Sequence, residues 1–283
     1  MHAAVAPSPA VARSPAVARS PAVARSPAVA PSPAVARPVR FQTPRAKAEV
    51  SRMPTLCSTC SLRAVCVPCG IRDEDMPGLD ELIYTRKRIR RGEHLIRAGE
   101  PFHALYAFRS GFFKSYVSTR DGKVHVTGFP MAGDLTGMDG IGTDHHTQSV
   151  VALEDGEVCV VPYAHLQEVA ARIPALQHQF HRMMSREIVR EQDLMTLLGS
   201  MRAEAKVAEF LLQMSARFAA RGYSASEFNL RMTREEIGSY LGLKLETVSR
   251  IISKLQDEGV IKANLRYIAI VDSEALLTMT AEP

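Results

Sequence analysis

The hydrophobic and polar positions of this 283-residue chain follow two different periods. From about residue 82 to 170, apolar and polar residues alternate in short runs separated by turns, and this pattern predicts short strands arranged as a sandwich or roll. After Pro174 the apolar residues recur every three or four positions, which predicts helices. We therefore expect a β-rich part followed by a helical part, in the α+β class.

Turn signals separate the expected strands. Asp121-Gly122 stands between two alternating runs and predicts a tight hairpin. The expected strands are Leu82–Tyr84, His94–Arg97, Ala104–Arg109, Phe113–Ser118, Lys123–Phe129 and Val158–Val161.

The helical part opens with a long helix from Pro174 to about Met201, and a second helix is expected from Ala203 to Arg221. One side of the long helix carries residues at steps of 4, 4, 3, 4 and 3, which is the spacing of a coiled-coil seam between two copies. Glu191 lies in the middle of this seam, where it either faces its own copy or rotates to the solvent-exposed rim. The seam residues are Phe180, Met184, Ile188, Glu191, Met195 and Leu198.

Two short helices joined by a glycine-containing turn are expected next, and this arrangement is typical of a DNA-binding helix-turn-helix. Thr233 and Glu236 have the spacing of a capping box at the start of the first helix, and Gly242 supplies the turn. The expected elements are helices over Arg234–Leu241 and Lys244–Asp257, then a hairpin of Val260–Ala263 and Tyr267–Val271.

The second of these helices presents Glu246, Ser249 and Arg250 on one face near its N-terminus, the end that meets base edges. Arginine pairs with guanine, and a carboxylate accepts a hydrogen bond from the cytosine amino group. Lys262 and Arg266 on the following hairpin favour phosphate contacts. The alternative is that this face is the solvated side of an ordinary amphipathic helix.

The N-terminal residues differ in composition from the rest. Residues 8–37 are five near-copies of Ser-Pro-Ala-Val-Ala-Arg, and the recurring proline predicts disorder with local polyproline II, with a weak basic DNA tether as the alternative. Residues 1–50 carry a net charge of +6 and the whole chain +5, so the remaining residues are close to neutral and give little electrostatic support for nucleic-acid binding. Met53 is a candidate for the true start of the protein.

Four of the five cysteines fall within thirteen residues, at Cys57, Cys60, Cys66 and Cys69, and Cys159 lies far downstream. Clustered thiolates suit thiophilic metals, but Cys60 and Cys66 are too close for the two knuckles of a zinc ribbon. One loop around a compact cluster is favoured, with disulfides as the alternative. The chain has no apolar stretch of about 18 residues and no signal-peptide pattern, so we expect a cytoplasmic protein with reduced thiols.

Together these motifs resemble the fumarate and nitrate reduction regulator branch of the cyclic-AMP receptor protein superfamily of bacterial transcription regulators. The resemblance spans residues 57–275. It is carried by the spacing of Cys57, Cys60 and Cys66, by Gln192-Asp193, and by the segments 105–116, 127–134, 218–223 and 232–250.

The resemblance implies a β-roll (cupin-like) sensor domain, a long dimerisation helix and a winged helix-turn-helix domain. It implies a homodimeric regulator that binds double-stranded DNA, and not an enzyme. The expected boundaries are 1–53 for the repeat tail, 54–80 for the cysteine-rich loop, 81–172 for the sensor domain, 173–201 for the dimerisation helix and 202–283 for the DNA-binding domain.

The resemblance further implies an oxygen-labile 4Fe-4S cluster, with which the protein dimerises and binds a pseudo-palindromic promoter site under anaerobic conditions. The implied ligands are Cys57, Cys60, Cys66 and Cys159. Cys69 is additional to the family pattern and could replace Cys159. The alternative function is an oxygen-indifferent DNA-binding regulator with zinc held by the four clustered cysteines.

Other positions are carried over by the same resemblance. Ser61 matches a position that tunes oxygen reactivity, and Asp121–Lys123 and Arg217–Phe228 match segments that touch RNA polymerase. The family's base-reading residues match Glu246, Ser249 and Arg250. No arginine follows the Gly133-Asp134 turn before Val150, so a cyclic phosphate would lack its bidentate partner and we expect no cyclic nucleotide.

Overall fold

The computed structural model describes residues 50–51, 56–81, 85–119 and 121–281. The repeats at residues 8–37, Met53 and the expected strand Leu82–Tyr84 lie outside the described residues. None of the described helices combines the length and apolarity needed to cross a lipid bilayer.

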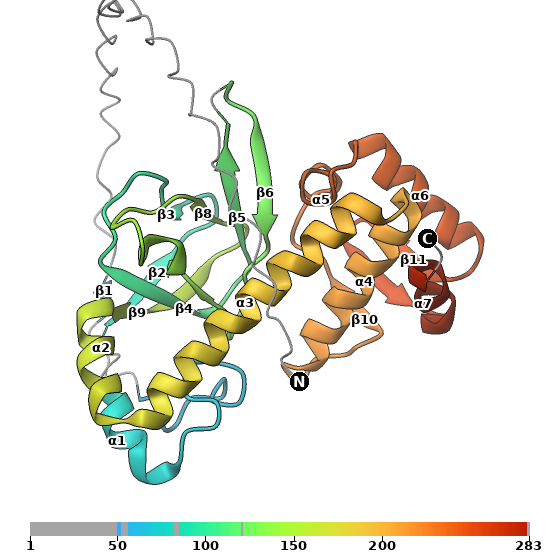
Figure 1. The fold of residues 1–283 in the computed structure, drawn as a ribbon. Coiled ribbons are helices and arrows are strands. Elements are labelled where there is room, and N and C mark those ends of the chain that lie inside the picture. The colour runs from blue at the N-terminus through green and yellow to red at the C-terminus, as the bar shows by residue number, and fades with distance from the viewer. Residues whose placement is uncertain (1–49, 52–55, 82–84, 120, 282–283) are drawn as a thin grey trace, which may run out of the picture. The chain divides into compact units, whose positions relative to one another are not determined.

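Two antiparallel sheets form the β-rich part (Figure 1). One has the strand order β1-β2-β9-β4-β7 and the other the order β3-β8-β5-β6. Their bounds are β1 Val50–Ser51, β2 Thr85–Ile89, β3 His94–Ile96, β4 Ala104–Ser110, β5 Phe113–Ser118, β6 Val124–Gly128, β7 Leu135–Thr136, β8 Ser149–Ala152 and β9 Gly156–Pro162.

The two sheets share a buried core. Phe108 of β4 and Phe113 of β5 are fully buried, and their ring centroids are 4.5 Å apart. Val150 of β8 and Val158 of β9 join the same cluster, so alternate residues of both sheets point inward. This is the expected β-roll, and the α+β class is confirmed.

Helices precede, follow and connect these sheets, and a small third sheet of order β10-β12-β11 completes the C-terminal part. The helices are α1 Met76–Asp80, α2 Tyr163–Arg172, α3 Pro174–Ser200, α4 Ala203–Ala219, α5 Arg234–Leu241, α6 Leu245–Asp257 and α7 Ser273–Ala281, with short 3-10 turns at Asp73–Asp75 and Met138–Gly140. The third sheet contains β10 Glu227–Asn229, β11 Ile261–Asn264 and β12 Tyr267–Ile270.

Most of the expected elements are confirmed. The long helix α3 ends one residue before the predicted Met201, and α5 has both predicted ends. The Thr233 hydroxyl accepts from the Glu236 N–H at 3.1 Å, and the Glu236 carboxylate accepts from the Thr233 N–H at 2.8 Å, so the capping box is present.

Two expectations for the β-rich part were wrong. Residues 163–170 were expected among strands and turns but begin α2, whose buried Leu166 and Val169 are three positions apart on one face. The strand Thr85–Ile89 was missed because its sequence, Thr-Arg-Lys-Arg-Ile, has almost no apolar alternation. It forms because its backbone pairs with β9 along its whole length.

An ionic cluster fastens α4 to the β-rich part. The Asp134 carboxylate accepts from Arg217 and, at 2.6 Å, from Arg221. The same arginines also donate to backbone carbonyls, Arg217 to Phe129 and Arg221 to Ala132. We call Asp134, Arg217 and Arg221 the Asp134 clamp.

Further contacts fasten α5 to β5 and β6. Lys114 of β5 donates to Glu236 at 2.8 Å. The Ser239 hydroxyl accepts from the Val126 N–H and donates to the Val124 carbonyl. The helix-turn-helix unit is therefore bonded to the edge strand of a sheet through one of its own helices.

Replacing Asp134 with asparagine is expected to lower the free energy of unfolding by about 1–3 kcal/mol, because the side chain of Arg221, only 7% exposed, loses its charged partner. Urea unfolding followed by circular dichroism measures the change. Asp121→Asn, in an exposed hairpin, is the matched control and is expected to leave the midpoint unchanged. Equal midpoints for the two variants would contradict the importance of the clamp.

Candidate functional site

The cysteine-rich segment is a succession of turns held at both ends. The N–H and hydroxyl of Ser58 donate to the carboxylate of Asp80 at 3.0 and 2.6 Å. Arg63 donates to the carbonyl of Ile71 at 3.1 Å and pairs with Asp73. These bonds tie the loop to α1 and to itself, so its cysteines are held in a defined segment of chain.

Four of the five cysteines line one small cavity of about 20 Å³. Cys57, Cys60 and Cys66 come from the loop, and Cys159 comes from the middle of β9. Cys69 is not among the residues that line this cavity. The fold thus brings Cys159 to the loop across more than 90 positions of sequence, which the spacing of the loop cysteines could not indicate.

Burial raises the pKa of three of these thiols, those of Cys57, Cys66 and Cys159. Burial, with smaller contributions from the neighbouring cysteines, raises the pKa of Cys57 to about 12. Burial likewise raises the pKa of Cys66 to about 12 and that of Cys159 to about 11, the latter against the positive charges of Arg86 and Arg109. Thiolates at this site therefore need a cation or cluster to stabilise them.

The donor set fits a thiophilic metal group, but the cavity is smaller than such a group. Four thiols, in walls that are apolar apart from Arg63 and Arg109, suit iron-sulfur or zinc chemistry. In the described part of the chain, however, no three His, Cys, Asp or Glu side chains are close enough together to hold a metal ion. A cavity of about 20 Å³ admits little more than one water, so a metal cluster would need more room than this arrangement of the loop leaves.

The seam residues of α3 lie where a second copy could reach them. Ile188, Met195 and Leu198 are 55, 64 and 39% exposed, which is unusual for large apolar side chains on one helix. Phe180 and Met184, nearer the helix start, are half-buried, and Glu191 is exposed.

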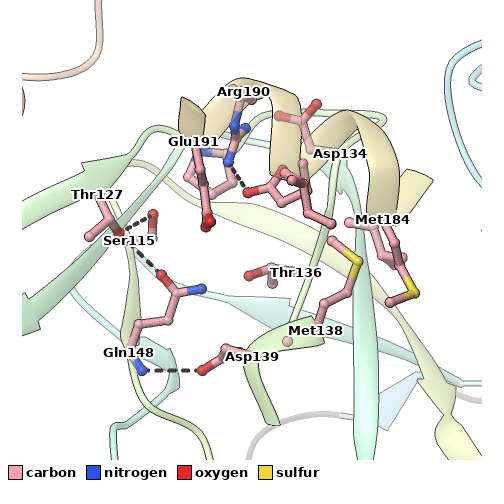
Figure 2. Close-up of a pocket in the computed structure, with 15 residues that line it drawn as sticks. Ser115, Thr127, Asp134, Thr136, Met138, Asp139, Gln148, Met184, Arg190 and Glu191 are labelled. Carbon is pink, nitrogen blue, oxygen red and sulfur yellow. Dashed lines mark hydrogen bonds and ion pairs between the residues drawn. The ribbon is translucent and has the colours of Figure 1, made fainter. Parts of the chain in front are cut away.

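A larger cavity of about 260 Å³ lies between α3 and the sheets. Figure 2 shows Arg190 and Glu191 of α3 on one side and Thr136, Met138 and Asp139 on the other. Arg190 pairs with Glu187. The cavity is acidic, since four carboxylates line it against this single guanidinium; they are Asp134, Asp139, Glu187 and Glu191.

The expected DNA-reading residues lie together on α6. Glu246 and Arg250 are exposed and Ser249 is half-buried, while Val248, Ile251, Ile252 and Leu255 are buried on the other side of the helix. Gly242 has φ of 64° and makes the turn from α5 to α6.

Arg231 and Arg234, two basic residues beside the β11–β12 hairpin, were missed in the sequence, whereas Arg266 on the hairpin was expected. Arg231, Arg234 and Arg266 line a cavity between the start of α5 and the β11–β12 hairpin. Arg234 donates to the Leu265 carbonyl at 3.3 Å, and its buried Nη1 has no hydrogen-bond partner among the described residues. Their spacing along the chain has no period, so only the fold reveals this basic corner.

Two domain families match the chain. The Crp-like helix-turn-helix domain matches residues 205–279, and the cyclic nucleotide-binding domain matches residues 86–172. The first covers the α4–α7 region and the second covers β2 to α2.

Several curated proteins are similar over most of their length. The transcriptional regulatory protein btr of Bordetella pertussis is 45% identical over 220 residues, which are 78% of this chain and 91% of the relative. The fumarate and nitrate reduction regulatory protein of Escherichia coli is 41% identical over 220 residues, 78% of this chain and 88% of the relative. Among solved structures, FixK2 of Bradyrhizobium japonicum matches with a TM-score of 0.65 and 30% identity, over 70% of this chain and 98% of that one.

Proposed function

The chain belongs to the fumarate and nitrate reduction regulator branch of the cyclic-AMP receptor protein superfamily, and from this premise we propose that it is an oxygen-responsive transcription regulator that holds a 4Fe-4S cluster. The family consists of DNA-binding regulators with a helix-turn-helix, and not of enzymes. The observation that carries the proposal is the set of four thiols, from two distant segments, around one cavity.

In this proposal the ligands are Cys57, Cys60, Cys66 and Cys159. When bound, the cluster would react with oxygen, and this reaction would be the signal. Cys57 and Cys159 belong to the same buried cluster of side chains as Leu176 of α3, and Cys66 and Phe180 pack against that cluster. Movement of the cysteine loop would therefore displace side chains at the start of the dimerisation helix.

The exposed seam of α3 is proposed as the dimer interface. Burying Ile188, Met195 and Leu198 against a second copy would remove their apolar surface from water. Glu191 lies among them and would approach its own copy, which opposes dimerisation. Loop movement on cluster loading would then adjust α3 enough to offset this repulsion.

The exposed face of α6 is proposed to read a pseudo-palindromic promoter site. Glu246, Ser249 and Arg250 would contact base edges, and Arg266 with its neighbours at the wing would contact phosphates. The exposed hairpin Asp121–Lys123 and the exposed part of Arg217–Phe228 are proposed to meet RNA polymerase.

A cyclic nucleotide is not proposed as a ligand, although the matching domain family carries that name. The carboxylate of Asp134 is already bonded to Arg217 and Arg221, and Arg190 is paired with Glu187. The remaining charge of the 260 Å³ cavity is negative and repels a phosphate.

Cys159→Ala is expected to abolish retention of iron and sulfide, and Cys69→Ala, the matched control, to leave it unchanged, because only the first thiol lines the cavity. Iron, acid-labile sulfide and zinc are assayed per protomer after anaerobic purification. The reverse result would move the fourth ligand to Cys69, and a colourless zinc protein would favour the oxygen-indifferent alternative.

Arg250→Ala is expected to lose about 1–3 kcal/mol of discrimination between the operator and a scrambled sequence, because a bidentate contact to guanine disappears. Lys262→Ala, at the wing, is the comparison and should weaken binding to both sequences about equally. Anaerobic gel-shift titrations measure both. Unchanged operator preference in Arg250→Ala would show that α6 is not the reader.

Glu191→Ala is expected to dimerise in air without a cluster. Two carboxylates about 6 Å apart at an effective dielectric of about 20 repel by roughly 3 kcal/mol, about two decades in dimer affinity. Asp193→Ala, exposed on the same helix but outside the seam, should stay monomeric like the wild type. Analytical ultracentrifugation of the aerobic proteins decides, and a monomeric Glu191→Ala would refute the repulsion hypothesis.

A further inference from the structure

Two arginines of the β-strands stand close to the four thiols, and a third, Arg63 of the loop, lines the cavity but is paired with Asp73. Arg109, near the end of β4, lines the same cavity, and its Nη1 lies 3.9 Å from the sulfur of Cys60. Ala107, two positions earlier on β4, lines the cavity too, as expected for alternate side chains on one face of a strand. Arg86 of β2 lies directly opposite Cys159 in the β2–β9 pairing.

One carboxylate connects these arginines. Glu157, two residues before Cys159 on β9, accepts from Arg109 Nε at 3.1 Å and lies 3.9 Å from Arg86 Nη1. All three side chains are at most 31% exposed. Two guanidinium groups share one carboxylate, so this wall of the cavity keeps one excess positive charge.

Arg86 also has a hydrogen-bond donor that no described residue accepts from. The Nε of Arg86 is buried and has no hydrogen-bond partner among the described residues. A buried donor without a partner costs free energy unless an acceptor is supplied.

Four thiolates around a metal group carry net negative charge in a pocket whose other walls include Leu62, Pro68 and Ala107. Hydrogen bonds to the sulfurs, net charge and burial set the reduction potential of such groups. We propose that Arg109, held by Glu157 and supported by Arg86, is a positioning residue that stabilises the negative charge of the four-thiolate set and slows its oxidation. This inference rests on the proposed function.

The charge of each residue determines whether it slows or speeds the oxidation. Oxidation removes one electron from the thiolate-held group and transfers it to dioxygen, which leaves as superoxide, so the group becomes one unit less negative. A fixed positive charge stabilises the more negative form and opposes this transfer. Glu157 acts in the opposite direction, because its carboxylate cancels part of the guanidinium charge.

The test compares Arg109→Gln, Arg109→Lys and Glu157→Gln with the wild type. Arg97→Gln, which removes an exposed charge beyond β3 in the other sheet, is the control. Each protein is purified anaerobically and assayed for iron and sulfide. The midpoint potential is then measured by anaerobic redox titration, and the bleaching rate in air-saturated buffer by visible absorbance.

Arg109→Gln is expected to bleach about three- to tenfold faster, a modest effect because the guanidinium is partly exposed and shared with Glu157, and to have a lower midpoint potential. Arg109→Lys should recover part of both values, and Arg97→Gln should match the wild type. Glu157→Gln should bleach more slowly than the wild type. If Arg109→Gln retains no iron, Glu157→Gln tests the inference alone: slower bleaching than the wild type supports it, and equal or faster bleaching overturns it.

The outcomes separate the two proposals. If the wild type holds no iron and sulfide, the proposed function fails and this inference fails with it. If the wild type is loaded but Arg109→Gln and Glu157→Gln change the bleaching rate in the same direction, the ion pair is only structural and the inference alone is overturned. The same holds if Arg109→Gln keeps the wild-type rate and potential.

Discussion

The carboxylate of Asp134 is the point at which the separate parts of this structure are joined. It accepts from Arg217 of α4 and from Arg221, two residues beyond the end of that helix. The turn that carries Asp134 packs against the cysteine loop, because a Cβ on Gly133 would lie 2.7 Å from Val65. Gly133 has φ of 90°, so a side chain there would also strain the backbone. One turn therefore contacts the cysteine loop on one side and the DNA-binding helices on the other.

This arrangement gives a physical route from the thiols to the DNA-reading face. The cysteine loop packs in one cluster with the start of α3 and also contacts the Gly133 turn. In the proposed function, loading a cluster into the small cavity would shift this loop. Such a shift would reach α3, the proposed dimer helix, through the first contact, and would reach α4 through the second contact.

Local patterns predicted local structure well. The capping box at Thr233, the hairpin at Asp121-Gly122 and the long helix from Pro174 are short-range features whose chemistry is written in neighbouring residues. The charged strand Thr85–Ile89 and the wall of Arg86, Glu157 and Arg109 depend on pairing between distant segments, which no period reveals. The resemblance to a family supplied Cys159, and the fold placed it at the cavity while leaving Cys69 outside.

The side chain of Glu236 serves two partners at once. One oxygen closes the first turn of α5 by accepting from Thr233, and the other accepts from Lys114 on β5. Burial alone would raise the pKa of Glu236, but these bonds lower it, so the group stays ionised in both roles. The integrity of the helix start and the docking of the domain are thus thermodynamically linked, and release of the docked unit would fray α5 from its N-terminus. The two halves of the protein should therefore melt as one cooperative unit.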